Sequence, residues 1–321
     1  MRGAGNTGGI RSRLPEPRNR ATRNTSTHTE GHTQMADDKS RYRFLLIEAF
    51  HLKATAKHTT RKFIGPKEET LMNYKTLKPL LDTIEWDRDP GPEASYGDWP
   101  VETREEFDIV SAARLPIVRK ACESGKYNGI VLLGGGEPGF LASREIGHHF
   151  GIPVTSCAYS QMHMASTLGH RFSVIDLAEN HNMYYYDLVL RHQFANRCAS
   201  IRNINFPLPR PPYTGETTRA EQMAKMARGE KSEMVEAAVV EAVAAIEEDG
   251  ADVLTFGCSG TFWLQPHLKQ RLIDMGWDVP VLEGYSCAIT LCKALVDLGV
   301  TVSGTVFPAD RPKKIRRRKV F

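Results

Sequence analysis

Several sequence features that define common protein classes are missing from this 321-residue chain. No apolar run is long enough to span a bilayer, so we expect no membrane-spanning segment. The six cysteines form no C-x-x-C pair and no zinc-finger spacing, and no secretory apolar segment precedes them. We therefore expect reduced cysteines, no bound metal and a cytoplasmic location. The glycine-rich stretches are not followed by the Lys-Ser or Lys-Thr of a P-loop, which excludes that nucleotide site.

A net positive charge is also missing from the body of the chain, because the net charge of +4 comes from the two ends. Residues 1–34 hold six arginines against Glu16 and Glu30, and residues 313–319 add six positive charges. The part between them therefore has a net charge of −6, which argues against nucleic-acid binding on the folded body.

The two ends are predicted to lie outside the folded body. Residues 1–40 contain almost no large apolar residue and are expected to be a disordered N-terminal extension. An arginine-rich leader could be an organelle transit peptide, but we favour an over-long start with Met35 as the true beginning. Residues 309–321 are expected to be a solvated basic tail rather than a nuclear signal or an RNA-contacting arm.

Short apolar runs, typical of buried parallel strands, alternate along the chain with segments of helical periodicity. The predicted strands are 43–47, 81–86, 129–133, 152–157, 171–176, 252–256 and 279–282. The predicted helices are 74–82, 103–120, 138–149, 161–168, 184–191, 232–249, 264–275 and 288–298, and residues 87–92 and the surroundings of Cys198 are predicted loops. This alternation indicates an α/β fold, with parallel sheets flanked by helices and sites at the carboxyl ends of the strands.

A glycine-rich turn, Gly134-Gly135-Gly136-Glu137-Pro138-Gly139, follows the predicted strand 129–133. Backbone N–H groups at such a turn point outward and suit a carboxylate, a phosphate or an enolate. Its glycine spacing also fits the dinucleotide fingerprint, but no acidic residue ends the next strand, so we expect no nucleotide cofactor.

A second glycine turn, Gly257-Cys258-Ser259-Gly260-Thr261, follows the predicted strand 252–256. A helix N-terminus lowers the ordinary thiol pKa of about 8.5, so we expect Cys258 to be the most reactive of the six cysteines. Ser259, Gly260 and Thr261 can donate hydrogen bonds to a bound carboxylate. The alternative is that Cys258 is a small residue of the core.

Five motifs resemble those of the aspartate/glutamate/hydantoin racemase superfamily and follow the same order along the chain. The resemblance to hydantoin racemase is the strongest. The five motifs are Gly136-Glu-Pro-Gly139, Gly169-His-Arg-Phe-Ser-Val-Ile175, Asn196-Arg-Cys-Ala-Ser-Ile-Arg202, Gly257-Cys-Ser-Gly260 and Pro280-Val-Leu-Glu-Gly284. The resemblance covers roughly residues 43–307. It implies two similar α/β domains related by a pseudo-twofold axis, with the active-site cleft between them. The domains would be 41–158 plus 280–308 and 159–279.

The resemblance also implies cofactor-free proton transfer by two cysteines on opposite faces of a carbon. In this chain Gly134 occupies the position of the first cysteine, and Cys258 occupies that of the second. Glu48-Ala49-Phe50 replaces the family's Asn-Pro-Asn, and Tyr159 replaces a common glutamate. Glycine first and cysteine second is the arrangement of arylmalonate decarboxylase, in which the lone cysteine protonates an enolate.

The sequence therefore predicts an isomerase of this superfamily that acts without a cofactor on a small carboxylate or a cyclic imide. Cys258 would transfer the proton. Gly134, Gly135, Gly136, Ser259, Gly260 and Thr261 would bind the substrate, with Glu137 or Tyr159 as a possible second acid or base. The alternatives are a single-cysteine decarboxylase or lyase and a non-catalytic small-anion-binding relative, and a homo-oligomer stays open. We also expect a cysteine at position 134 to be tolerated and to face Cys258.

Overall fold

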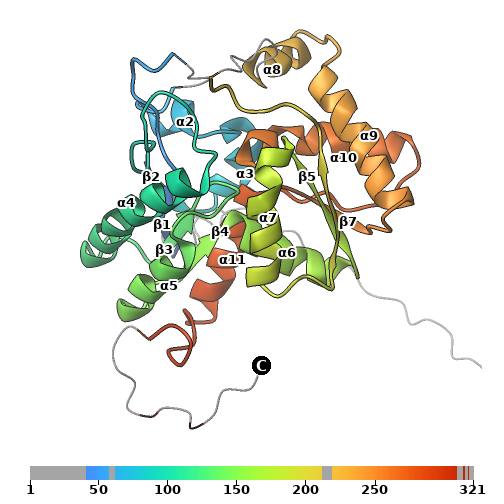
Figure 1. Cartoon of the computed structure of the whole chain (residues 1–321). Coiled ribbons are helices and arrows are strands. Elements are labelled where there is room, and N and C mark those ends of the chain that lie inside the picture. The colour runs from blue at the N-terminus through green and yellow to red at the C-terminus, as the bar shows by residue number, and fades with distance from the viewer. Residues whose placement is uncertain (1–40, 58–61, 212–218, 309–313, 315–316, 318–321) are drawn as a thin grey trace, which may run out of the picture.

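Two parallel sheets form the centre of the molecule in the computed structural model, which describes residues 41–57, 62–211, 219–308, 314 and 317 (Figure 1). The first sheet has the order β2-β1-β3-β4, and the second has the order β6-β5-β7. Every strand pair in both sheets is parallel. The strands of each sheet therefore end at one common edge, and the connections between them must cross over.

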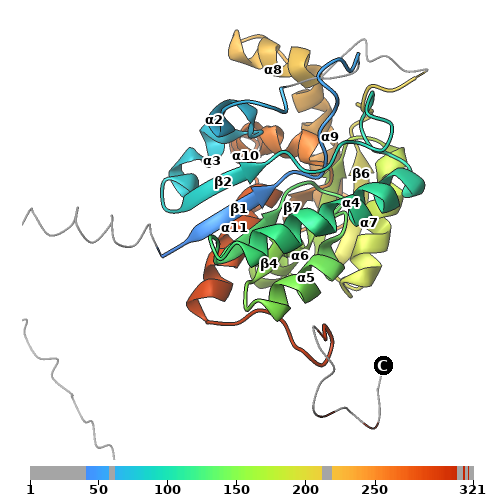
Figure 2. The same ribbon diagram turned by 90° about the vertical axis from the view of Figure 1, so that its left-hand side faces the viewer.

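The first sheet is formed by β1 (Arg43–Ile47), β2 (Glu85–Asp89), β3 (Gly129–Leu132) and β4 (Val154–Ser156). Side chains alternate between its faces, so Phe44 and Leu46 contact one layer while Leu45 and Ile47 contact the other. Helices α4 (Arg104–Glu123) and α5 (Phe140–His149) cover one face, and α3 (Tyr74–Leu81) and α11 (Gly284–Asp297) cover the other (Figure 2).

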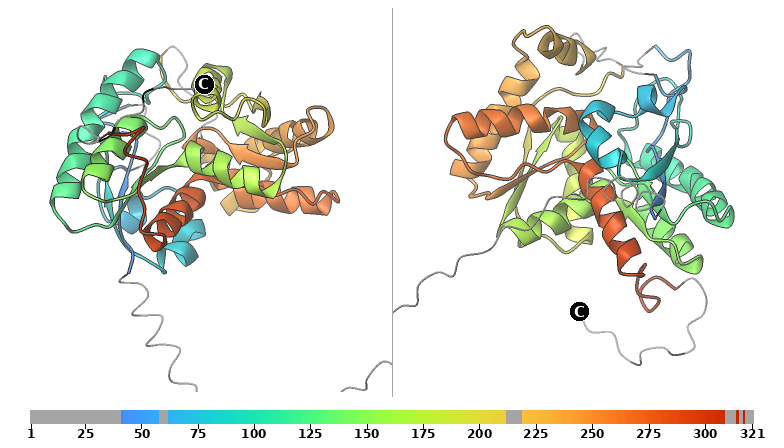
Figure 3. Two further views of the ribbon diagram at one scale, coloured as in Figure 1. Left: turned by 90° about the horizontal axis from the view of Figure 1, so that it is seen from below. Right: turned by 180° about the vertical axis from the view of Figure 1, so that it is seen from behind.

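The second sheet is formed by β5 (Phe172–Asp176), β6 (Cys198–Asn203) and β7 (Val253–Phe256). Helices α6 (Cys157–Leu168) and α7 (Glu179–Arg191) pack on one face. Helices α9 (Glu233–Glu247) and α10 (Gln265–Asp274) lie on the other, on the side away from α4 and α5 (Figure 3). The remaining elements are α2 (Lys67–Thr70), α8 (Arg219–Ala227) and the 3₁₀ helix η1 (Ser259–Leu264).

Local sequence signals place several helix ends as expected. Thr103 and Glu106 form the predicted capping box of α4, and the Ser232 hydroxyl accepts from the Val235 N–H at the start of α9. Helix α5 begins at Phe140 rather than at 138, because Gly139 has a left-handed backbone with φ 73° and cannot be part of the helix.

The predicted fold class, α/β with parallel sheets flanked by helices, is confirmed. Three strand predictions were wrong. Residues 87–89 belong to β2 rather than to a loop, and Cys198 begins β6. Residues 279–282 make only one bridge, between Leu254 and Val281. The domain boundaries stay a prediction, and residues 1–40 and most of 309–321 lie outside the described residues.

Candidate functional site

The two glycine turns meet between the sheets. A Cβ placed on Gly135 would overlap the carbonyl oxygen of Gly257 and would lie 3.0 Å from the Cα of Cys258. The contact is therefore backbone against backbone, and only glycine fits at position 135. The turn after β3 and the turn after β7, which were predicted separately, are two walls of one site.

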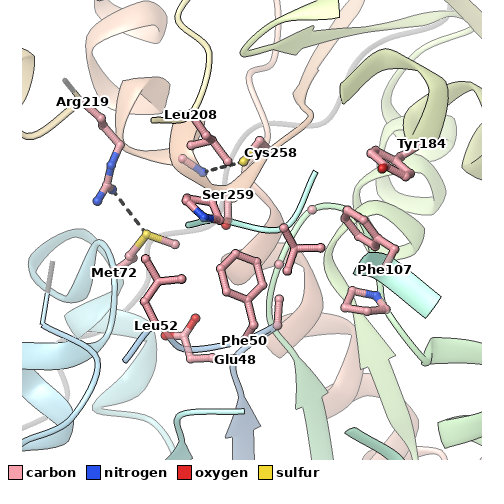
Figure 4. Close-up of a pocket in the computed structure, with 18 of the residues that line it drawn as sticks. Glu48, Phe50, Leu52, Met72, Phe107, Tyr184, Leu208, Arg219, Cys258 and Ser259 are labelled. Atoms are coloured by element: carbon pink, nitrogen blue, oxygen red, sulfur yellow. Dashed lines mark hydrogen bonds between the residues drawn. The ribbon is translucent and has the colours of Figure 1, made fainter. Parts of the chain in front are cut away.

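A cavity of about 100 Å³ opens beside this contact (Figure 4). Gly134, Gly135, Gly136, Cys258, Ser259 and Gly260 line it, so six predicted site residues share one cavity. Most of the other lining side chains are apolar or aromatic: Phe50, Leu52, Phe63, Met72, Val101, Phe107 and Leu208. Polar groups come from Glu48, Tyr184 and Arg219.

Cys258 lies where β7 gives way to η1, and its side chain accepts from the Gly260 N–H at 3.4 Å. Its own N–H donates to Asp176 Oδ1 at 2.8 Å. All six cysteines lie within the described residues, and among them Cys258 alone lines the cavity. That position distinguishes it from the other five thiols.

The expected low pKa of Cys258 was wrong. Burial and then the charge of Asp176 raise the pKa of this thiol to about 12, against smaller opposing effects of the Gly260 N–H and of Arg219. Burial likewise raises the pKa of Cys122 and of Cys198 to about 11. A single N–H dipole does not offset the loss of water around the sulfur.

Gly134 does not leave room for the thiol that the resemblance would place there. Its φ is 104°, a conformation that strains any residue with a side chain, and a Cβ would lie 2.7 Å from the Ala49 Cβ. The expectation that a cysteine at 134 would be tolerated is therefore wrong. The three glycines of this turn contribute only backbone to the cavity, which Pro138 also lines.

Buried Arg114 holds the turn after β3 in place. Its guanidinium donates to the carbonyl oxygens of Leu133 at 2.8 Å and Pro138 at 3.2 Å, and also to that of Ile47. Burial lowers the pKa of Arg114 to about 10, so the side chain still carries its charge at neutral pH. One cation in the core thus fixes the ends of β1 and β3 together.

Glu137 and Tyr159 do not lie in the cavity that Cys258 lines. The buried Glu137 carboxylate accepts from His192 Nε2 at 2.8 Å, from the Tyr159 N–H at 2.5 Å and from the Ser156 hydroxyl. Tyr159 packs against His163 and Phe140. Within the described part of the chain neither residue lines the cavity with Cys258, so we assign them to holding the turn against α6 and α7.

Thr261 stabilises the turn that carries Cys258. Its hydroxyl donates to the Cys258 carbonyl oxygen at 2.6 Å, and its N–H donates to the same oxygen at 2.9 Å. The side chain is fully buried and does not line the cavity. Thr261 closes the first turn of η1 and so fixes Cys258 rather than a substrate.

Three charged residues near or in the cavity were missed. Asp176 ends β5 and could have been found, because it stands at the carboxyl end of a predicted parallel strand. Glu48 follows β1, where Arg88 Nε donates to it at 3.1 Å, and both side chains are buried. Arg219 begins α8, a helix that the sequence did not predict, so no local signal pointed to it.

The described residues lack two kinds of feature. No group of three or more His, Cys, Asp or Glu side chains is arranged to hold a metal ion. No helix within the described ranges has the length and apolar character needed to cross a bilayer.

Known proteins resemble this chain across most of its described part. A family model described as Asp/Glu/Hydantoin racemase matches residues 98–292. The hydantoin racemase of Pseudomonas sp. (strain NS671) is 27% identical over 192 residues, which are 59% of this chain and 68% of that protein. The hydantoin racemase of Paenarthrobacter aurescens is 26% identical over 168 residues, which are 52% of this chain and 61% of that protein.

A solved structure shows the same fold. Allantoin racemase from Klebsiella pneumoniae is 23% identical, with a TM-score of 0.58 over 85% of this chain and 95% of that chain. The region matched by the family model contains both glycine turns and Cys258 but begins after β1 and β2.

Proposed function

The chain belongs to the Asp/Glu/hydantoin racemase family, and on this premise we propose that it transfers a proton at a carbon next to a carboxylate or imide carbonyl, with Cys258 as the acid or base. The observation that carries the proposal is the position of the Cys258 thiol on the wall of a cavity formed by both glycine turns. A positioned acid or base of this kind typically accelerates proton transfer by about 10²–10⁴-fold. The cytoplasmic location stays a prediction.

The anion that forms during such a transfer needs donors at the reacting carbon. The backbone of Gly134–Gly136 and the Ser259 and Gly260 end of η1 line the same cavity as the thiol. Preorganised N–H and hydroxyl donors stabilise an enolate strongly where water is excluded. Arg219 adds a cation at the cavity wall, which would pair with a substrate carboxylate.

The apolar lining narrows the substrate class. Phe50, Phe107 and Leu208 offer no hydrogen-bonding group to a polar substituent, and burying such a group without a partner is unfavourable. A cavity of about 100 Å³ also limits the size of the group that fits. We propose a hydantoin, or a related imide or carboxylate, whose α-carbon carries a small apolar substituent.

A second candidate, a single-cysteine decarboxylase or lyase, is favoured by Gly134. With no room for a side chain there, no second thiol faces Cys258. In a decarboxylation the C–C bond breaks and its electron pair forms the enolate, while carbon dioxide leaves. The Cys258 S–H bond then supplies the proton to the α-carbon, and water returns a proton to the thiolate.

Proton NMR in deuterated water tests both candidates on a panel of substituted hydantoins, amino acids and substituted malonates. Exchange of the α-proton with loss of optical activity supports racemisation, and release of carbon dioxide supports the decarboxylase. In both cases Cys258→Ser must remove the activity. Binding without turnover across the panel would instead indicate a non-catalytic small-anion-binding relative.

A further inference from the structure

Asp176 is a buried carboxylate in direct contact with the turn that carries Cys258. It ends β5, and its side chain is fully buried. The N–H groups of Cys258 and Leu177 both donate to its Oδ1, each at 2.8 Å. The carboxylate therefore fixes the backbone of a residue 82 positions further along the chain.

The same carboxylate leaves no space on the neighbouring residue. A Cβ on Gly257 would overlap the carboxyl group of Asp176. The second oxygen, Oδ2, is buried and has no hydrogen-bond partner among the described residues. A buried oxygen without a donor is unfavourable, so its presence beside Cys258 suggests a role beyond stability.

The charges around the Cys258 sulfur come from several elements. Asp176 on β5 and Glu102 in the loop before α4 disfavour a thiolate, whereas Arg219 at the start of α8 favours one. Tyr185 on α7 also lines the cavity, and burial and the nearby carboxylates raise its pKa, so it stays neutral at ordinary pH. Asp176 is the strongest of these charges on Cys258.

We propose that Asp176 is a positioning residue that holds the Cys258 sulfur in its protonated form and so makes Cys258 the proton donor of the site. The role of Asp176 during turnover rests on the proposed function. The S–H bond breaks as the new C–H bond forms, and the thiolate left behind takes a proton from water. The negative charge of Asp176 disfavours that thiolate and so drives the return of the proton.

Alkylation by iodoacetamide tests the inference without any substrate. The full chain and Asp176→Asn are labelled from pH 7 to pH 11, and Cys258 is followed by peptide mapping. Because alkylation needs the thiolate, a thiol pKa lowered by about one unit gives roughly tenfold faster labelling at each pH below the inflection, and we expect this rise for Cys258 in Asp176→Asn. An unchanged rate for Cys258 in the folded variant overturns the proposal.

Glu283→Gln is the matched control. Glu283 is also a buried carboxylate that accepts two backbone N–H bonds, from Tyr285 and Ser286, but its charge acts on Cys157 and Cys287. Its replacement should leave the labelling rate of Cys258 unchanged. A matching rise in the labelling of the buried Cys157 and Cys292 in Asp176→Asn would show only a loosened structure and would also overturn the proposal.

A second measurement needs no change at Asp176. The ultraviolet absorbance of thiolate in the unaltered chain, minus that of Cys258→Ser, isolates the titration of Cys258. An inflection at or below the ordinary thiol value overturns the proposal, because Asp176 would then not disfavour the thiolate. If Cys258→Ser keeps its turnover, the proposed function fails while the labelling of Asp176→Asn still decides the effect of Asp176.

Discussion

The two glycine turns occupy corresponding places at the ends of β3 and β7, yet they are built for different tasks. The turn after β3 offers no acid or base side chain to the cavity, because Ala49 and Phe107 fill the space that side chains at Gly134 and Gly136 would need. The turn after β7 offers a thiol, held by Asp176 and Thr261. In the proposed function, one half of the site binds the anion while the other half supplies the proton.

The largest expected effect comes from removing the thiol. Cys258→Ser should lower turnover of an identified substrate by about 10²–10⁴-fold, because a hydroxyl is a much weaker acid than a thiol. Cys198→Ser, at a half-buried thiol outside the cavity, is the matched control and should keep its turnover. Steady-state rates check both variants, and near-normal activity in Cys258→Ser would refute the assignment.

A cysteine in the turn after β3 should destabilise the fold rather than supply a second thiol opposite Cys258. Gly134→Cys places a side chain at a positive φ and against Ala49, so we expect a loss of about 1–3 kcal/mol in the free energy of unfolding. Gly151→Ala is the control, since Gly151 has φ 71° but nothing within 4 Å of a Cβ. Urea unfolding compares the two. Equal losses would mean that the space at 134 is open after all.

A smaller effect is expected from the cation at the cavity wall. Arg219→Gln should raise KM for a carboxylate substrate about tenfold and change kcat less, because a charge-assisted hydrogen bond contributes about 1.5–3 kcal/mol. Arg228→Gln, which removes an exposed arginine paired with Glu230 just beyond α8, should change neither constant. A fall in kcat alone for Arg219→Gln would assign the arginine to the transition state instead.

The smallest expected effect is on the free energy of unfolding at alkaline pH. The pKa of Cys258 is raised by folding, so the native state keeps a proton that the unfolded state releases. This contribution is fully present below the ordinary thiol pKa and is lost as the pH rises toward about 12. Cys258→Ser should therefore lose stability less steeply between pH 8.5 and pH 11 than the unaltered chain does. Urea unfolding across this range measures the slopes, and identical slopes would contradict the raised pKa.

The fully buried strands could be predicted from sequence because burial on both faces requires continuous apolar runs, as in Phe172–Asp176 and Val253–Phe256. The edge strands β2 and β6 were misplaced or missed because their side chains are charged or polar and only partly buried. A search for continuous apolar runs does not find strands whose side chains are only partly buried.

For the site, local patterns predicted the two turns and Cys258 but not the state of its thiol. The predicted pKa considered one helix end, whereas the folded chain adds burial and the charge of Asp176. Arg219 and Glu48 reach the cavity through tertiary packing that no short motif encodes. Residue identity at a turn is local information, while electrostatic environment is a property of the whole fold.

Helix α11 has a consequence for the order of events during synthesis. The strands of the first sheet all lie before residue 157, yet Ala288, Ile289 and Cys292 of α11 pack with Phe44 and Leu46 on one of its faces. A chain leaving the ribosome therefore presents that face covered only in part, by α3, until more than a hundred further residues have been added. Such a nascent sheet is exposed to aggregation, and its completion depends on the last helix of the described chain.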